Sequence, residues 1–277
     1  EREKVDVVIP VHFSGHPARM REIRALSEKY NFKIIEDCCH ALGAMYEGSS
    51  VGNCEFSDLS MFSFHPVKHI TSGEGGCITT NSEELWKRLT RARTHGMHKD
   101  SHQFQNRELG FDANGEVNPW YYEMEEIGFN YRITDIQCAL GISQLKKLAK
   151  FIKRRREIAD FYSNVFANLE HVKTPVEAED VLHAYHLYTL RINFEALGKS
   201  RRQIMKELSE RGIGTQVLYI PLHFQPYYKQ RYGYQRGDFP NAEQYYSECL
   251  SIPMFSGLSD QEMKYISENV IEILEQA

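Results

Sequence analysis

The alternation of apolar and polar residues predicts a strand, a helix and a second strand at the start of the chain. Residues 5–11 (VDVVIPV) and 32–36 (FKIIE) are apolar runs rich in β-branched residues, which is typical of strands covered on both faces. Between them, apolar residues recur at helical spacing at Met20, Ile23, Leu26 and Tyr30. This order predicts two parallel strands joined by a helix. Asp37 then falls at the carboxyl edge of the sheet, where such sheets bind ligands.

The next part of the chain predicts two more strands and a helix. Residues 59–64 (LSMFSF) and 76–80 (GCITT) have the length and composition of short strands, and residues 82–93 have helical spacing. Residues 96–125 carry no regular period and are too long for a simple connector. We therefore expect a loop there that serves function or contacts a partner.

The second half of the chain predicts a smaller unit of alternating helices and strands. Residues 135–166 are strongly helical and lead away from the first part. We place a domain boundary near Lys150, with a large domain at residues 1–150 and a small α/β domain at 151–277. Its predicted elements are a strand at 184–194, a helix at 200–211, a strand at 215–219 and helices at 241–250 and 259–276.

Composition narrows the class of protein. The chain has 277 residues, of which 42% are hydrophobic, so it can bury a sizeable core. Its 33 basic and 38 acidic residues give a net charge of −5, which argues against a nucleic-acid partner. No apolar run reaches the length of a membrane span and the start lacks the order of a signal peptide, so we expect a cytoplasmic protein. Six cysteines without paired C-x-x-C spacing predict reduced thiols and no metal site.

One lysine stands in a sequence context that suits covalent chemistry. Lys68 follows the predicted strand 59–64, with Ser63 before it and a glycine-rich turn after it, at Gly73, Gly75 and Gly76. A lysine held near apolar groups loses its proton more readily than a solvated one and can act as a Schiff-base nucleophile. Glycines let the backbone approach a bulky anion, and Ser63 can donate to a phosphate. Alone, the pattern is far more often that of a solvated lysine beside a turn.

A carboxylate and an imidazole at the end of the second strand add to this pattern. Asp37 can pair with a protonated pyridine nitrogen, and His40, three residues later, can reach a ring hydroxyl. Each also has an ordinary structural interpretation, as a capping aspartate and a buried histidine. Their occurrence together with Lys68 favours a cofactor site.

These motifs resemble those of the DegT/DnrJ/EryC1/StrS family of pyridoxal-phosphate (PLP) nucleotide-sugar aminotransferases. The match extends over essentially the whole chain. An acidic residue, two small residues and a Gln or His match Asp37 and His40; a Ser-Phe-x-x-x-Lys turn matches Ser63 and Lys68; and Gly-Glu-Gly-Gly follows at residues 73–76. The resemblance implies the aspartate-aminotransferase (type I PLP) fold.

The resemblance also implies roles for these residues. Lys68 would hold the cofactor covalently, Asp37 would pair with the pyridine nitrogen, His40 would lie at the ring hydroxyl, and Ser63 would contact the phosphate. An Asn-x-Arg stretch places Asn130, with Arg132 beside it, at the cofactor phosphate of the neighbouring subunit. A homodimer with shared active sites is therefore implied.

Within the family, residues 184–194 and 215–260 look like the transaminases that form a 4-amino-4,6-dideoxy sugar nucleotide in pseudaminic acid synthesis. The implied substrates are a UDP-linked 4-keto sugar and glutamate. We take Tyr219 and His223 as candidates for contacts with the sugar nucleotide, because aromatic faces and neutral donors suit it. His186, among alternating aromatic residues, is assigned to strand packing.

Two alternatives remain open at this point. Family members begin with a segment of roughly a hundred residues that carries a phosphate-cradling turn and a ring-stacking aromatic residue, and this sequence starts after both. We therefore expect a large-domain sheet that is incomplete on its N-terminal side. A truncated, non-catalytic protein with a structural or regulatory role is one alternative. A PLP-dependent sugar dehydratase is the other, and Lys68 argues against it because the dehydratases carry histidine there.

Overall fold

The computed structural model of the protein describes residues 4–276, and its first half is built on a four-stranded sheet. The strands lie in the order β1 (Val7–Val8), β2 (Lys33–Asp37), β5 (Leu59–Ser63) and β6 (Gly76–Thr79). The first three are parallel, and β6 is antiparallel to β5. Each coincides with an apolar run that predicted a strand, although β1 pairs over two residues only and β2 extends one residue beyond its run, to Asp37.

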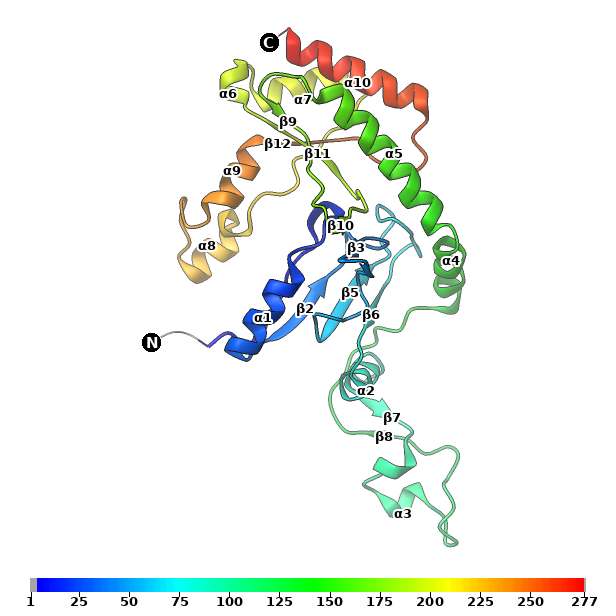
Figure 1. Ribbon diagram of the computed structural model, residues 1–277. Coiled ribbons are helices and arrows are strands. Elements are labelled where there is room, and N and C mark those ends of the chain that lie inside the picture. The colour runs from blue at the N-terminus through cyan, green and yellow to red at the C-terminus, as the bar shows by residue number, and fades with distance from the viewer. Residues whose placement is uncertain (1–3, 277) are drawn as a thin grey trace.

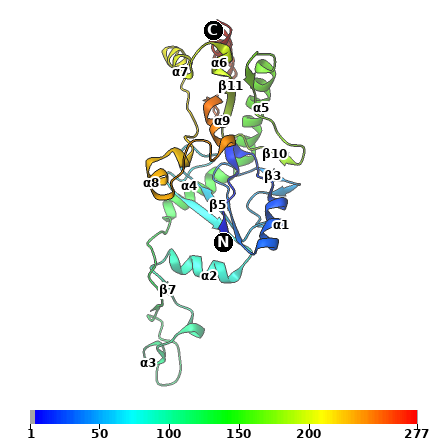
Figure 2. The same ribbon diagram turned by 90° about the vertical axis from the view of Figure 1, so that its left-hand side faces the viewer.

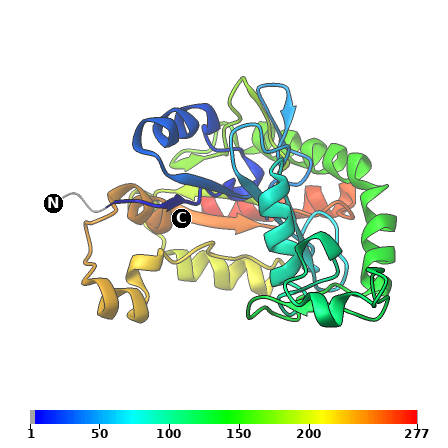
Figure 3. The same cartoon turned by 90° about the horizontal axis from the view of Figure 1, so that it is seen from below.

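Helix α1 (Met20–Tyr30) joins β1 to β2 and lies along one face of this sheet (Figure 1, Figure 3). Met20 is buried and packs with Ile34 and Tyr46, so the apolar stripe of the helix attaches it to the strand beside it. Asn31 ends the helix in the left-handed conformation, with φ at 55°. The predicted parallel strand, helix, strand unit is confirmed.

The first apolar run is more exposed than its sequence predicts. A strand covered on both faces would bury all its side chains, but alternate residues here are between 45% and 52% exposed; they are Val5, Val7, Ile9 and Val11. Helix α1 packs on one face of the sheet only. Within residues 4–276, the alternate side chains on the other face of this strand therefore remain partly open.

Residues 83–124 form an extension that projects from the sheet, as Figure 1 shows from the front and Figure 2 from the side. It contains α2 (Glu83–Ala92), β7 (Met97–His98), a 3-10 turn (Ser101–Gln103), α3 (Arg107–Gly110) and β8 (Glu123–Met124). Antiparallel pairing of β7 with β8 closes the extension. Helix α2 forms where a helix was predicted at 82–93, and the stretch 96–125, predicted to lack a regular period, has only the four short elements that follow it.

Two helices then return the chain to the body of the molecule. They are α4 (Asp135–Leu145) and α5 (Leu148–Phe166). Thr134 caps α4 in a reciprocal pair with Gln137, and the Gln137 N–H lies 3.3 Å from the Thr134 Oγ1. The sequence predicted helical structure across residues 135–166, and two helices form there.

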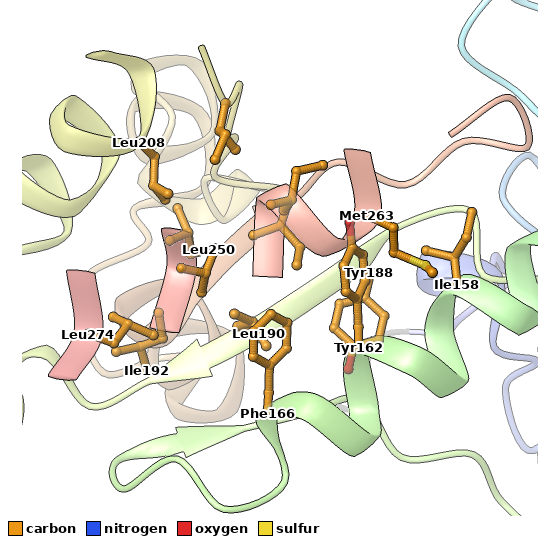
Figure 4. Packing of buried hydrophobic residues seen from close by; sticks show 14 of the residues in the cluster. Ile158, Tyr162, Phe166, Tyr188, Leu190, Ile192, Leu208, Leu250, Met263 and Leu274 are labelled. Atoms are coloured by element: carbon orange, nitrogen blue, oxygen red, sulfur yellow. The ribbon is translucent and has the colours of Figure 1, made fainter. Parts of the chain in front are cut away.

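A second core lies around a three-stranded antiparallel sheet in the C-terminal half. Its strands are β12 (Cys249–Ile252), β11 (Tyr188–Ile192) and β9 (Val172–Lys173), in that spatial order. Helices α5, α7 (Arg201–Glu210) and α10 (Asp260–Glu275) pack on it. Figure 4 shows Tyr162 and Phe166 of α5 against Tyr188 and Leu190 of β11, all fully buried.

Several predicted elements of this half need correction. The strand predicted at 184–194 begins only at Tyr188, because residues 184–187 bond to Ser14 and Gly15 instead. No strand forms at 215–219, where Gln216 alone bridges Ser251. The helix predicted at 241–250 is α9 (Pro240–Glu248), since the next residues join β12. The remaining helices are α6 (Phe194–Leu197), α8 (Pro226–Tyr232) and a 3-10 turn (Leu222–Phe224).

A small third sheet crosses between the two halves of the chain. Strand β10 (Val181–Leu182) pairs antiparallel with β3 (Met45–Tyr46), which pairs with β4 (Ser49–Ser50). The C-terminal half therefore supplies one strand to the N-terminal half.

The domain boundary near residue 150 stays a prediction, and the packing of α5 supports a division within that helix. Leu148 and Ile152 pack with Ala41 of the first half, whereas the residues from Ile158 onward belong to the second core. Across residues 4–276, no helix combines the length and the apolarity that a bilayer crossing requires.

Candidate functional site

The candidate residues gather at the carboxyl edge of the first sheet. Strands β2 and β5 are parallel, and Asp37 pairs with Met61, so Asp37 and the end of β5 at Ser63 lie at the same edge. A groove of about 690 Å³ opens there. Its lining is Val11, Phe13, Asp37, Cys39, His40, Lys68, Val217, Tyr219, Ile220, Leu222 and Gln225. We call it the Lys68 groove; it brings together four of the eight candidates, Asp37, His40, Lys68 and Tyr219.

Asp37 is anchored by its backbone and keeps part of its carboxylate free. Its N–H donates to the Pro10 carbonyl at 2.9 Å, and its own carbonyl accepts from the His12 N–H at 3.0 Å. The Cys39 N–H donates to Oδ1 at 3.0 Å. Among residues 4–276, the other carboxylate oxygen accepts no hydrogen bond. A carboxylate with one oxygen still unbonded, at the edge of a groove, can bind a cationic nitrogen.

Lys68 sits in the turn after β5, half-buried, with its N–H bonded to the His65 carbonyl at 2.9 Å. Burial lowers the pKa of its ammonium, and Cys39 and Asp37 oppose that shift. The ammonium has no ion-pair or hydrogen-bond partner within the described part of the chain. A larger fraction of this amine is therefore unprotonated, and nucleophilic, than for a solvated lysine.

His40 is buried beside the groove and is held on its Nδ1 side. The Ser14 N–H donates to His40 Nδ1 at 3.3 Å, and the Tyr219 ring stacks near the imidazole at a centroid distance of 6.2 Å. Burial lowers the pKa of His40 to about 4. The positive charge of Lys68 lowers it as well, whereas the negative charge of Asp37 opposes the shift. The imidazole is therefore uncharged near neutral pH.

Ser63 ends β5 but does not line the Lys68 groove. Its Oγ accepts from the His65 N–H at 3.3 Å, which stabilises the turn that carries Lys68. The glycine-rich segment closes the same turn, since the Phe64 N–H donates to the Gly75 carbonyl at 2.8 Å. Gly75 has φ at 153°, and a Cβ there would lie 2.5 Å from the Ser72 Oγ, so the turn requires glycine at this point.

Asn130 and Arg132 lie outside the groove, exposed, on the segment between the extension and α4. The Arg132 Nε donates to the Asn130 Oδ1 at 3.1 Å, and Asn130 bridges Thr94 near the end of α2. This position leaves both side chains open to a neighbouring molecule, and the structure does not bring them to the Lys68 groove of the same chain.

The structure places the two substrate candidates at different sites. Tyr219 lines the Lys68 groove, half exposed. His223 is buried elsewhere, with Nε2 at 2.9 Å from the Glu243 Oε1 and its ring against Phe224 and Phe239. Its Nε2 is occupied by a hydrogen bond with Glu243, so the geometry does not place His223 at the groove.

Sequence reasoning missed three groups around the site. Cys39 and Phe13 line the groove, and neither has a motif that marks it. His186 was assigned to strand packing; in the structure it precedes β11, and its ring lies 4.3 Å from that of His40. The only sequence signal for His186 is a histidine among aromatic residues, which is common in ordinary cores.

The chain matches the model of the DegT/DnrJ/EryC1/StrS aminotransferase family over residues 2–271. It is 41% identical to the uncharacterized protein MJ1066 of Methanocaldococcus jannaschii, over 96% of this chain and 68% of that one. It is 37% identical to the spore coat polysaccharide biosynthesis protein SpsC of Bacillus subtilis, over 99% and 68%. It is 35% identical to a UDP-4-amino-4,6-dideoxy-N-acetyl-beta-L-altrosamine transaminase of Campylobacter jejuni, over 99% and 67%.

Solved structures show the same fold. The aminotransferase PseC of Helicobacter pylori, which is involved in pseudaminic acid biosynthesis, superposes with a TM-score of 0.88 at 28% identity, over 100% of this chain and 69% of that one. The PLP form of the putative sugar aminotransferase Spr1654 of Streptococcus pneumoniae gives a TM-score of 0.81 at 27% identity, over 98% and 69%. The chain thus spans about two thirds of the length of these relatives and has their type I PLP aminotransferase fold.

Three observations point to the same family. Asp37, His40 and Lys68 lie together at one sheet edge, the family model matches nearly all residues, and the fold is shared. The chain belongs to the DegT/DnrJ/EryC1/StrS aminotransferase family, a family of PLP-dependent sugar aminotransferases.

Proposed function

We propose that the protein transfers the amino group of glutamate to the 4-keto group of a UDP-linked deoxyhexose, with PLP as cofactor. The observation that carries this proposal is the Lys68 groove, where an amine, a carboxylate and an uncharged imidazole face one space. The likeness to the C. jejuni transaminase and to PseC favours a sugar of pseudaminic acid synthesis.

The groups that line the groove fit this cofactor. Lys68 has an amine without a protein partner, and Asp37 has a carboxylate oxygen without one, which are the two groups that an aldehyde and a pyridine nitrogen require. His40 suits the ring hydroxyl. Ser63 is proposed for the phosphate, and Asn130 and Arg132 for the phosphate of a neighbouring subunit in a homodimer. When bound, PLP supplies an electron sink for the carbon that loses its proton.

Lys68 has two proposed tasks. Its Nζ would hold the cofactor covalently until the amino donor takes its place. The freed Nζ would then accept the proton from the α-carbon of the donor and would later donate a proton to the keto carbon of the sugar that receives the amine. Its lowered pKa suits the first step of each task, because only the unprotonated amine can attack or accept a proton. Tyr219, on the groove wall, is proposed to pack against the sugar nucleotide.

Asp37 is proposed to hold the ring nitrogen in its protonated form, and Asp37→Asn tests this. The amide keeps the shape of the side chain but loses the charge that favours the protonated nitrogen. We expect transamination to fall by about 10²-fold or more, with the free energy of unfolding little changed. Steady-state kinetics and urea unfolding measure the two quantities. Asp160→Asn, an exposed change on α5, is the matched control and should leave both unaltered. Full activity in Asp37→Asn would remove Asp37 from the proposal.

The proposed function is tested by the absorbance spectrum of the intact protein titrated with PLP and then with glutamate. We expect a visible band on addition of PLP, which glutamate converts to the shorter-wavelength band of the aminated cofactor. A UDP-linked 4-keto sugar should restore the first band. A protein that develops no band with PLP would instead have a structural or regulatory role. A band that glutamate leaves unchanged would favour the dehydratase alternative.

A further inference from the structure

Three buried histidines meet behind the Lys68 groove. The His186 ring lies 4.3 Å from that of His40 and 5.3 Å from that of His69, measured between centroids. These side chains come from three separate parts of the chain: the loop after β2, the turn after β5 and the segment before β11. All three residues are at most 7% exposed. We call them the histidine cluster.

The backbone fixes His186 in this cluster. Its N–H donates to the Ser14 carbonyl at 2.8 Å, and its carbonyl accepts from a terminal nitrogen of Arg155 at 3.1 Å. A Cβ on Gly15, which has φ at 99°, would lie 2.9 Å from the His40 carbonyl oxygen and 3.0 Å from the His186 nitrogen. The absence of a side chain at Gly15 is what allows His40 and His186 to approach so closely.

The turn at Ser14 also decides which nitrogen of His40 carries a proton. The Ser14 N–H can only donate, so His40 Nδ1 must accept, and the neutral ring then carries its hydrogen on Nε2. Within residues 4–276, Nε2 has no hydrogen-bond partner. Since His40 lines the groove, it offers a ligand one N–H donor without a positive charge.

The surroundings of the cluster oppose a charge on His40. His40 itself faces Lys68, Asp37 and the Tyr219 ring, while Arg155 faces the other two members of the cluster, His69 and His186. Only Asp37 favours the imidazolium, and Asp37 is the group proposed to hold the ring nitrogen of the cofactor. A protonated His40 would lose its bond from Ser14 and would attract Asp37 away from that nitrogen. Burial is the largest cause of the low pKa of His40, and His186 contributes directly to that burial.

We propose that His186 is a positioning residue: its buried ring covers one face of His40, keeps water from it and so maintains His40 as an uncharged Nε2–H donor in the Lys68 groove. The inference rests on the proposed function in one respect: the group that accepts the hydrogen bond from His40 Nε2–H is taken to be the ring oxygen of PLP. Charge and tautomer at His40 are properties of this chain alone.

The test is an NMR titration of histidine side chains in the intact, cofactor-free protein, with ¹⁵N-labelled histidine and a His40→Gln variant to assign the signal. In the unaltered protein, His40 should remain the Nε2–H tautomer down to about pH 5. His186→Ala opens a water-accessible space beside it, so we expect the His40 pKa to rise by about one unit or more. His186→Phe restores an apolar ring of similar size, and it should return the pKa to within a few tenths of its original value.

Two outcomes would overturn the inference. One is a His40 signal that titrates identically in His186→Ala and in the unaltered protein. The other is a failure of His186→Phe to rescue, which would show that the nitrogens of His186 matter rather than its coverage. Should His186→Ala not fold, His186→Asn takes its place, because it removes the ring and keeps a small polar side chain.

A second readout separates this inference from the proposed function. The affinity for PLP should fall severalfold in His186→Ala as the pH drops below about 5, where His40 would be mostly charged in that variant, and recover at higher pH. A protein that does not bind PLP at any pH would refute the proposed function. The NMR titration would still decide the role of His186.

Discussion

Replacement of Lys68 by alanine is expected to abolish transamination, by at least about 10⁴-fold, the upper end of what one positioned acid–base group contributes. The variant loses both the amine that binds the cofactor and the proton carrier. Because Lys68 is half-buried and has no ion-pair partner among the described residues, its removal should change the free energy of unfolding by less than about 1 kcal/mol. Single-turnover absorbance measurements with glutamate, and urea unfolding, provide the two numbers.

Two control variants make this result specific. Lys206→Ala removes a lysine whose side chain is 76% exposed, on α7, and should retain full activity. Lys68→Arg keeps a positive charge in the groove but has no amine able to form the covalent bond, so it should be as inactive as the alanine variant. Measurable turnover in Lys68→Ala would contradict the assignment of Lys68 to the chemistry.

Stability should fall steeply as the pH drops from about 6 to 4.5, because the fold buries uncharged histidines. Burial lowers the pKa of His40 to about 4 and those of His69 and His183 to about 3, and it also lowers that of His186. In the unfolded chain these side chains take up protons below their ordinary value of 6.5. The unfolded state therefore binds up to about four more protons than the native state in this range, and each is worth about 1.4 kcal/mol per pH unit.

If all four histidines contribute a full proton, the free energy of unfolding falls by about 5 kcal/mol per pH unit. Urea unfolding curves recorded every half unit between pH 7 and 4.5 measure it. Carboxylates affect stability at a lower pH than the histidines do. The pKa of Glu36 is held below its ordinary 4.5, so the stability that this carboxylate contributes is lost as the pH falls below that value. Replacement of His183 by glutamine should reduce the uptake by about one proton. A slope that corresponds to less than one proton would show that these histidines are charged in the folded protein.

The sequence predicted the elements whose signals are local. The apolar runs at 32–36 and 59–64 and the helical spacing at 20–30 lie where β2, β5 and α1 form. The sequence predicted Asp37 at the carboxyl edge of its strand and Lys68 just after the strand at 59–64. The parallel pairing of β2 with β5, which brings both residues to one edge, is seen only in the structure. The roles of these residues in the chemistry remain predictions.

What the sequence could not predict depends on contacts between distant residues. Residues 184–187 have the apolar alternation of a strand, yet Ser14 and Gly15 bind their backbone and turn them toward His40. His223 has the polarity of a substrate contact, but Glu243 of α9 takes its nitrogen. Neither partner is near in the sequence, so no pattern of spacing reveals it.

The pairing of β10 with β3, and of residues 184–187 with the Ser14 turn, bears on the order of events during synthesis. The wall of the Lys68 groove that contains His40 cannot be completed until the ribosome has delivered residues well beyond α5. A nascent chain released at the end of that helix would leave the edge of β3 unpaired and the Ser14 turn without its partner. The His40 side of the groove should therefore form late in synthesis, only once the second half of the chain has emerged from the ribosome.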